Sequence, residues 1–420
     1  MTDGKHDGLA RLSRGQLAEL CREYMLAAQF NSRTGYAALR INHGDEAYRD
    51  VAIENWMAAS PVYTRRMQEA MRLRGTSDVE TILKGMQLEC GLAHQYFDAR
   101  FRMVGPEQGE FWLQRCGPLL ETEPRGEEAV RLMCHDIEDP TFDATAVATN
   151  PRARVRPLHR PPREPADRVP HCHWRVHVDP AEAPIEELEV TRDIGSSLLA
   201  NIDIVRTYSL EAGGLEYYDG PLFEQMHLER FSHAALLVIC KELAVQMHLL
   251  VNSLGLAVAR RYGAAAAAAV AEFQMAGAGC VVSERLARWR GAEGGGIDAI
   301  LEVLELHPAF QPGEYMALEL HRAGPDTVRI AFPDCPAALE PLPRGWYPLI
   351  VARASAGLAS LVQGVDPRAI LTVLPGDYPA WEISLVEEAA EETLAVQVAR
   401  GTVLYRTQLE SHIQLLELQA

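Results

Sequence analysis

An internal repeat constrains the fold of this chain more than any other feature of its sequence. Blocks of the first half recur in the same order in the second half, between 207 and 219 residues later. One matched pair is "VETILKGMQL" at 79–88 and "IDAILEVLEL" at 297–306, and another is the ungapped pair "CGPLLETEPRG" at 116–126 and "CPAALEPLPRG" at 335–345. Because chance matches do not keep a common order, we predict a duplicated domain.

Three further matches support the repeat: the turn at 105–106 falls on 324–325, "NPRA" at 150–153 falls on "DPRA" at 366–369, and Trp174 falls on Trp381. Residues that both copies keep are assigned mainly to the fold. Residues that only one copy keeps are candidates for chemistry.

Hydrophobic periodicity gives each copy the same order of elements. Residues 15–90 carry apolar positions at helical spacing, residues 96–117 predict an antiparallel hairpin, and "HCHWRVHVD" at 171–179 alternates as a strand. We expect one helix to begin at Ser60-Pro61 and a short helix at 127–139 to end at Asp139-Pro140. The prediction is an α+β fold of two pseudo-symmetric modules, each a helical bundle followed by an antiparallel sheet.

The predicted domain limits follow from this repeat. Residues 1–180 form the first module, 181–221 a linker, 222–395 a second, degenerate module, and 396–420 a C-terminal extension.

Composition excludes several classes of function. The chain has 420 residues and a formal net charge of −18, so it lacks the basic footprint that nucleic-acid binding needs. We find no run of about 20 apolar residues and therefore expect no membrane span. The polar N-terminus and eight cysteines without a CxxC pair predict a cytoplasmic protein with free thiols.

The strongest difference between the copies lies at residues 133–139. The first copy has "MCHDIED" there, whereas the second has "ARASAGL" at 352–358, without a thiol, imidazole or carboxylate. The fold therefore manages without these groups in one copy. We predict that the chemistry of the protein lies in residues 134–175 of the first copy.

A metal site is one interpretation of this region. Its cysteines and histidines suit Zn²⁺ or Fe²⁺, and the candidate ligands are Cys134, His159, His171, Cys172 and His173. On a strand His171 and His173 point to one face and Cys172 to the other, so the two histidines, or Cys172 with Cys134, are alternative ligand sets. The alternative without a metal is that the cysteines are buried and the histidines exposed.

Metal-free chemistry is the second interpretation. Cys134 is a candidate nucleophile with His135 as a nearby base, although adjacent helical residues do not face each other. Asp136 or Glu138 is a candidate general acid or base. The alternative is that these carboxylates are solvated before a turn at Asp139-Pro140.

Arginines crowd the same region of an acidic chain. Arg152, Arg154 and Arg156 alternate, which on a strand places them on one face, and guanidinium groups bind carboxylates bidentately. These three arginines and Trp174 are the candidate substrate-binding residues, and they predict a small anionic substrate. The alternative is a set of surface ion pairs with the nearby acidic residues.

The motifs "EFWLQRCGPLL" and "VPHCHWRVHV" carry a resemblance. Residues 79–180, and more weakly 297–390, resemble the superfamily of bacteriochlorophyll 4-vinyl-reductase-type ligand-binding domains and L-2-amino-thiazoline-4-carboxylic acid hydrolase-like proteins. The hydrolase-like members imply opening of a small heterocycle at a C–N or C–S bond. Sensor members imply zinc held by residues that correspond to Cys134, His159 and Cys172, but their fourth ligand falls near Pro162, which cannot bind metal.

We therefore expect a hydrolase or lyase that cleaves a C–N or C–S bond of a small carboxylate-bearing, heterocyclic substrate, with Zn or Fe as the candidate metal. No phosphate-binding GxxxxGK[ST] loop is present, so no nucleotide cofactor is evident. The alternative is a sensory, ligand-binding module without turnover. The degenerate copy is also a candidate dimerisation surface, which makes a homodimer a further expectation.

Overall fold

The computed structural model describes residues 8–207, 211–341, 345–352 and 355–406. The first half comprises α1 (Arg14–Met71), α2 (Asp78–Met86), β1 (Phe97–Gly105), β2 (Gln108–Cys116), α3 (Gly117–Thr122), α4 (Glu127–Arg131), a π-helical turn (Leu132–Ile137), α5 (Glu138–Val147), β3 (Ala153–His159) and β4 (Cys172–Val178). A linker with the short helix α6 (Glu189–Gly195) follows.

The second half repeats this order with α7 (His233–Tyr262), α8 (Ala264–Gln274), a π-helical turn (Met275–Gly279), α9 (Cys280–Trp289), α10 (Ile297–Leu306), α11 (Gly313–Met316), β5 (Glu319–Gly324), β6 (Thr327–Ala331), α12 (Tyr347–Val351), α13 (Ala356–Gln363), β7 (Ala369–Val373), β8 (Ala380–Leu385) and α14 (Leu394–Arg400). The fold is α+β, as predicted.

Each half begins with a helical hairpin that turns at a glycine. Gly44 inside α1 has φ 85° and ψ −178°, and Gly263 between α7 and α8 has φ 86° and ψ 168°. Only glycine adopts such angles without strain, so the chain reverses there. The amide of Asn55 donates to the hydroxyl of Tyr36 across the first hairpin, at 2.8 Å.

The helix starts match as well. Ser13 caps α1 and Ser232 caps α7, each accepting a hydrogen bond from the backbone N–H three residues later. Ser13 and Gly44 both recur 219 residues later, as Ser232 and Gly263. The repeat therefore extends through the helical parts of both halves without a gap.

The two sheets have the same topology. Their strand orders are β1-β2-β4-β3 and β5-β6-β8-β7, and all neighbouring strands are antiparallel. Trp174 pairs with Phe111 in the first sheet, and Trp381 pairs with Ile330 in the second. The predicted equivalence of the two tryptophans is confirmed.

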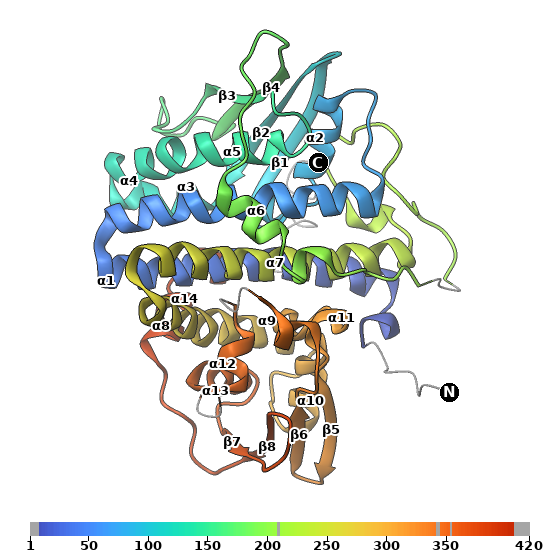
Figure 1. Ribbon diagram of the computed structural model, residues 1–420, viewed down its shortest axis with the longest axis vertical. Coiled ribbons are helices and arrows are strands. Elements are labelled where there is room, and N and C mark those ends of the chain that lie inside the picture. The colour runs from blue at the N-terminus through green and yellow to red at the C-terminus, as the bar shows by residue number, and fades with distance from the viewer. Residues whose placement is uncertain (1–7, 208–210, 342–344, 353–354, 407–420) are drawn as a thin grey trace.

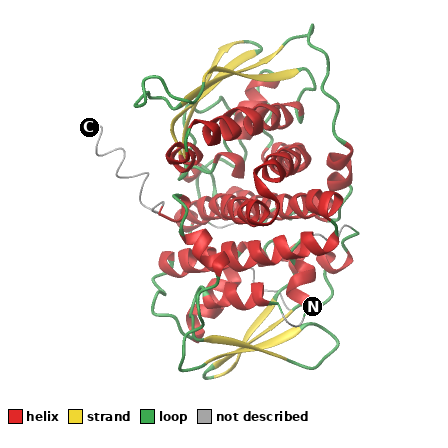
Figure 2. Cartoon of the chain, turned by 90° about the vertical axis from the view of Figure 1, so that its left-hand side faces the viewer, coloured by secondary structure: helices red, strands yellow, loops and turns green. Residues whose placement is uncertain are grey.

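The helices of both halves meet in the centre of the molecule. Figure 1 shows α1 and α7 side by side across the middle, with one sheet at either end, and Figure 2 shows the same layering from the side. The inner faces of both sheets pack on helices, and Trp174 and Ile383 are fully buried there.

Two buried ion pairs cross this central contact. Glu23 of α1 binds Arg285 of α9 through two hydrogen bonds of 2.7 and 2.8 Å, and Arg66 of α1 binds Glu242 of α7 through two of 3.0 and 2.7 Å. Glu23 and Glu242 are 219 residues apart, and so are Arg66 and Arg285. The contact is therefore self-complementary, as in a twofold dimer.

Two helix limits predicted from prolines are wrong. Pro61 lies inside α1, where the carbonyl of Met57 that lost its helical donor accepts instead from the Thr191 hydroxyl at 3.0 Å. Pro140 lies in the first turn of α5, which runs on to Val147 because a proline in a first helical turn leaves no needed donor missing.

Other expectations were too strict or fall outside the described residues. The repeated "PRG" at 343–345 and the C-terminal extension at 396–420 are described only in part. Two described stretches, His233–Tyr262 and Ala264–Trp289, are long and apolar enough to cross a membrane, contrary to the sequence prediction. The most apolar window of the first is wholly buried inside the protein, which core helices also show. Localisation stays a prediction.

We expect Glu23→Gln to lower the free energy of unfolding by about 3–5 kcal/mol, because the change leaves Arg285 buried without its carboxylate. Urea denaturation measures the effect. The control is Glu127→Gln, which removes an exposed pair with Arg131 and is expected to change stability by less than about 0.5 kcal/mol. Equal effects of the two changes would contradict the role assigned to the buried pair.

Candidate functional site

The stretch singled out in the sequence forms a π-helical turn between α4 and α5. The turn comprises Leu132–Ile137, and widened turns of this kind often occur at functional sites. It directs Cys134 into the core, where the side chain is 2% exposed, and leaves Asp136 exposed. Glu138, the first residue of α5, faces an internal cavity.

This cavity has a volume of about 90 Å³ and lies between both arms of α1, the end of α2, β1, α3 and α5. Its walls are mainly apolar and aromatic and include Trp56, Tyr63, Phe97 and Phe142. A water molecule occupies about 30 Å³ in the liquid, so the enclosed space suits a small molecule or one end of a larger one.

Glu138 is unusually basic for a carboxyl group. Burial raises the pKa of Glu138 to about 8, and nearby Asp139 raises it further, while Arg33 and Arg160 act in the opposite direction. The carboxyl group is therefore mostly protonated at neutral pH, and it can donate a proton to a bound molecule.

Glu89 is a second carboxyl group in the same cavity. Burial raises the pKa of Glu89 to about 7, although the hydroxyl of Thr64 donates a 2.6 Å hydrogen bond that stabilises the ionised form. The environments of Glu89 and Glu138 thus set their pKa values apart. Such a difference is typical of a general base and a general acid.

Arg33 brings a positive charge to the cavity wall. Its nearest carboxylate partner among the ion pairs is Glu121 at 3.6 Å, and its Nε has no hydrogen-bond acceptor within the described part of the chain. Its guanidinium also lies 6.0 Å from the ring centre of Tyr96. An incompletely paired cation beside two largely protonated carboxyl groups favours an anionic guest.

The cysteines near the cavity are protonated. Burial first, and the Glu138 charge second, raise the pKa of Cys134 and of Cys172 well above its ordinary range. Burial and Cys172 raise the pKa of Cys116 likewise. A thiolate nucleophile at Cys134 stays a prediction, but these surroundings do not favour it.

The predicted metal ligands do not converge. Cys172 lies on the inner face of the sheet with Cys134 in the core, whereas His173 points to the outer face and bonds Glu110 at 3.1 Å. His159 lies beside His173, with ring centres 6.1 Å apart. No group of three His, Cys, Asp or Glu side chains within the described ranges could hold a metal ion. A metal site stays a prediction.

The remaining histidines make local contacts. Nδ1 of His171 accepts a hydrogen bond from the backbone N–H of Cys116 at 3.1 Å, so it anchors the end of β2. The ring of His135 is half-buried, and its Nε2 lies 2.6 Å from the carbonyl oxygen of Pro161.

The three predicted substrate arginines hold the sheet to its surroundings. Arg152 donates to the carbonyl of Pro180 at 3.2 Å, Arg154 pairs with Glu182 at 3.5 Å, and Arg156 pairs with Asp143 at 2.9 Å. These contacts tie the linker and α5 to β3. They match the alternative of ion pairs with nearby acidic residues, and the substrate role stays a prediction.

Trp174 supports the cavity rather than lining it. The side chain is fully buried, and its ring lies 4.9 Å from that of Phe142, which forms part of the cavity wall.

Arg33 and Glu89 are the site residues that the sequence reasoning missed. The polar run "QFNSR" at 29–33 interrupts an apolar helical stretch, and that interruption was the available signal. In the second half, Asn252, His307 and Gly357 stand at the positions of Arg33, Glu89 and Glu138. Only the first half carries the charged set.

Comparisons with protein-family models, with curated proteins and with solved structures give no match. The resemblance inferred from the sequence therefore stays a prediction.

We expect Glu138 to make the protein less stable at high pH. Its pKa is raised in the folded state, so the folded protein binds more protons than the unfolded chain between about pH 4.5 and 8, and stability falls across that range. Glu138→Gln removes this cost and is expected to reduce the loss of stability between pH 5 and 8 by more than about 1 kcal/mol.

Urea denaturation at both pH values measures this change. The control is Glu128→Gln, which alters an exposed carboxylate of α4. If Glu138→Gln and Glu128→Gln have the same pH dependence as the wild type, Glu138 is not protonated in the fold.

Proposed function

We propose that this protein is an enzyme that acts on a small carboxylate-bearing molecule in the cavity between α1 and α5. One observation carries the proposal: Glu89, Glu138 and the incompletely paired Arg33 line the same mostly apolar cavity. An apolar cavity with a few convergent polar groups of shifted pKa is the usual form of a small-molecule site.

Arg33 would bind the carboxylate of the substrate. Its unpaired Nε offers a donor, and burial strengthens the charge-assisted hydrogen bond. The protonated Glu138 could also donate to an anion but would repel it once ionised. Binding should therefore weaken as the pH rises through about 8.

The two carboxyl groups would supply acid and base. Ionised Glu89 takes a proton from water, and the water oxygen attacks the unsaturated carbon of the substrate. The C–N or C–S bond then breaks while Glu138 gives its proton to the departing nitrogen or sulfur. A proton passes through solvent from Glu89 to Glu138 and restores the starting state.

The resemblance inferred from the sequence agrees with a small heterocyclic carboxylate as substrate. The chemistry needs no thiolate, which suits the raised pKa values of the buried cysteines. A metal at Cys134, His159, His171, Cys172 or His173 and a homodimer remain separate proposals, and elemental analysis and light scattering test them.

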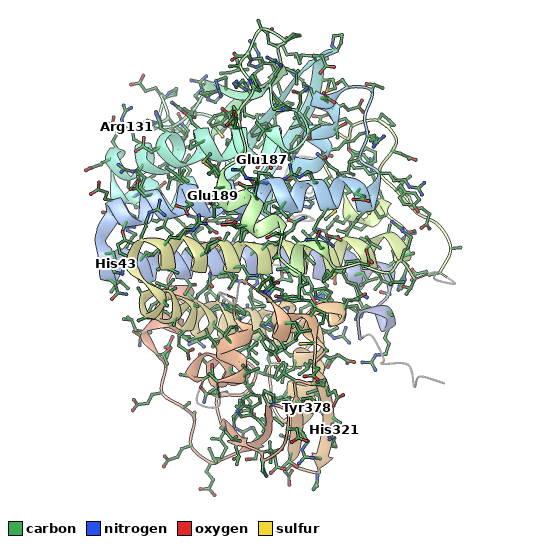
Figure 3. The ribbon with its side chains drawn as sticks, in the orientation of Figure 1. His43, Arg131, Glu187, Glu189, His321 and Tyr378 are labelled. Carbon is green, nitrogen blue, oxygen red and sulfur yellow. The ribbon has the colours of Figure 1, made fainter. Side chains whose placement is uncertain are left out.

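A binding assay tests the anion site first. We expect pyrrole-2-carboxylate to bind and its neutral amide to bind more weakly, and Arg33→Met to weaken carboxylate binding about tenfold or more, because it removes a charged hydrogen bond. Isothermal calorimetry at pH 7 measures both. Arg131→Met, on the exposed side of α4, is the control (Figure 3). Equal affinity for acid and amide would overturn the proposal.

Turnover is tested on small heterocyclic carboxylates, including 2-amino-thiazoline-4-carboxylate, by mass spectrometry of the products. We expect a bell-shaped pH profile of kcat/KM, with a fall below about 7 as Glu89 takes up a proton and a fall above about 8 as Glu138 loses one. Glu138→Gln should lower kcat/KM about 100-fold or more, and Glu128→Gln should not. Binding without turnover in the whole panel would favour the sensory, ligand-binding alternative.

A further inference from the structure

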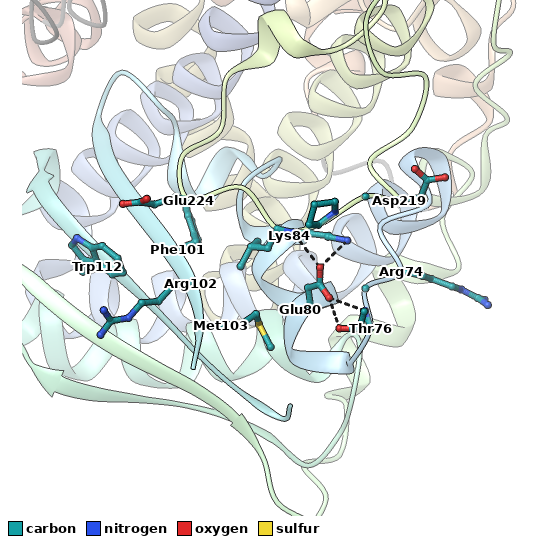
Figure 4. A pocket seen from close by; sticks show the side chains of 14 residues that line it. Arg74, Thr76, Glu80, Lys84, Phe101, Arg102, Met103, Trp112, Asp219 and Glu224 are labelled. Atoms are coloured by element: carbon teal, nitrogen blue, oxygen red, sulfur yellow. Dashed lines mark hydrogen bonds and ion pairs between the residues drawn. The ribbon is translucent and has the colours of Figure 1, made fainter. Parts of the chain in front are cut away.

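A second, larger hollow lies on the surface of the first half. This groove has a volume of about 1000 Å³ and runs between the loop before α2, the edge strand β1 and the linker at 219–224 (Figure 4). Its walls include the aromatic side chains of Phe101 and Trp112.

Lys84 lies at the groove with an incompletely satisfied charge. Its side chain is completely buried, and within the described residues its Nζ has no hydrogen-bond acceptor. Its carboxylate partner is Glu80 at 3.3 Å, and the ring centre of Tyr218 lies 5.2 Å away. An ammonium group offers three donors, so Lys84 has donors to spare.

The Glu80 carboxylate is already shared among other donors. It accepts from the N–H and hydroxyl of Thr76, each at 2.7 Å, and from the N–H of Leu222 at 3.1 Å (Figure 4). Glu80 therefore holds the loop and the linker together in addition to facing Lys84. An anion in the groove would supply the acceptor that Lys84 lacks.

Two arginines add positive charge along the same groove. Arg74 is exposed, and the exposed Arg102 lies 5.4 Å from the ring centre of Trp112 while pairing with Glu110 at 2.6 Å. The linker contributes the exposed acidic residues Asp219 and Glu224 at the groove. The charges are mixed, and Lys84 is the one whose hydrogen bonding is left incomplete among the groove's described ion pairs.

A small cavity connects the groove with the inner cavity. It has a volume of about 20 Å³ and shares Phe101 with the groove. It also shares Met86, Leu92 and Phe97 with the inner cavity. The three hollows therefore lie in a row that leads from the surface to Arg33, with Phe101 at its outer end.

We propose that the groove is an anion-binding entrance to the inner cavity. Lys84 binds the carboxylate of an arriving ligand, and the ligand then passes Phe101 to reach Arg33. The entrance rests on the function proposed for the inner cavity and extends it, because it selects organic anions before they reach the acid and base.

The second half offers an internal control. The matched helices place Glu302 at the position of Lys84, and the matched hairpins place His321 at the position of Arg102. Glu302 pairs with Arg290 there, and His321 is exposed on β5 (Figure 3). The second half therefore lacks the buried lysine of the first.

Stopped-flow tryptophan fluorescence with pyrrole-2-carboxylate tests the entrance, since Trp112 lines the groove and Trp56 the inner cavity. Lys84→Met is expected to lower the association rate constant about fivefold or more, because it removes an attractive charge from the path. Phe101→Trp should slow association and dissociation alike and leave Kd unchanged. His321→Ala is the control and should change neither rate.

Arg33→Met separates the two proposals. It should raise the dissociation rate and leave weak binding that disappears when Lys84→Met is added. Unchanged affinity in Arg33→Met would refute the inner site. Unchanged association rates in both Lys84→Met and Phe101→Trp would refute the entrance, even if the inner site stands. Failure of the wild type to bind the probe would refute both.

Discussion

Two buried arginine–glutamate pairs fix how the halves of this protein meet. Glu23 binds Arg285 and Arg66 binds Glu242, and each residue of one pair has its repeat counterpart in the other. Desolvated ion pairs add little net stability over apolar packing, but breaking one is costly, so they select this arrangement over others. The contact resembles a twofold dimer interface carried within one chain. The degenerate half thus already packs on a copy of itself.

This central contact also sets the place of the cavity. Both arms of α1 contribute to it: Arg33 comes from the first arm, and Trp56 and Tyr63 from the second. The turn at Gly44 brings these arms together, and α5 covers them with Glu138. The cavity therefore depends on the first hairpin, the π-helical turn and the sheet that supports Phe142 through Trp174.

Much of the fold follows from local sequence. The alternating strands, the Gly-Pro turns and the repeated tryptophan predict both hairpins and their pairing, because strand periodicity and turn residues act over short distances. The prolines misled the helix limits, since Pro61 is tolerated through a distant hydroxyl, Thr191, and Pro140 through its place in a first helical turn. Neither compensation is visible in the neighbouring residues.

The site was predictable only in part. Comparing the two copies led to Glu138, because the second copy has Gly357 there. Arg33 and Glu89 belong to other segments, and only the tertiary fold brings them to the same cavity. The arginines of β3 drew attention through their number, yet their partners in the linker and α5 occupy them. Crowding in sequence is thus a weaker guide to chemistry than a difference between two copies of one fold.

The central claim is that the first half encloses a protonated carboxyl group at neutral pH, at Glu138. An infrared difference spectrum between the wild type and Glu138→Gln at pH 7 tests it directly. The account predicts that the wild type shows the C=O stretch of a protonated carboxyl group that the variant lacks, and that this band disappears when the pH is raised above about 8. A difference spectrum that contains only carboxylate bands at pH 7 would contradict it.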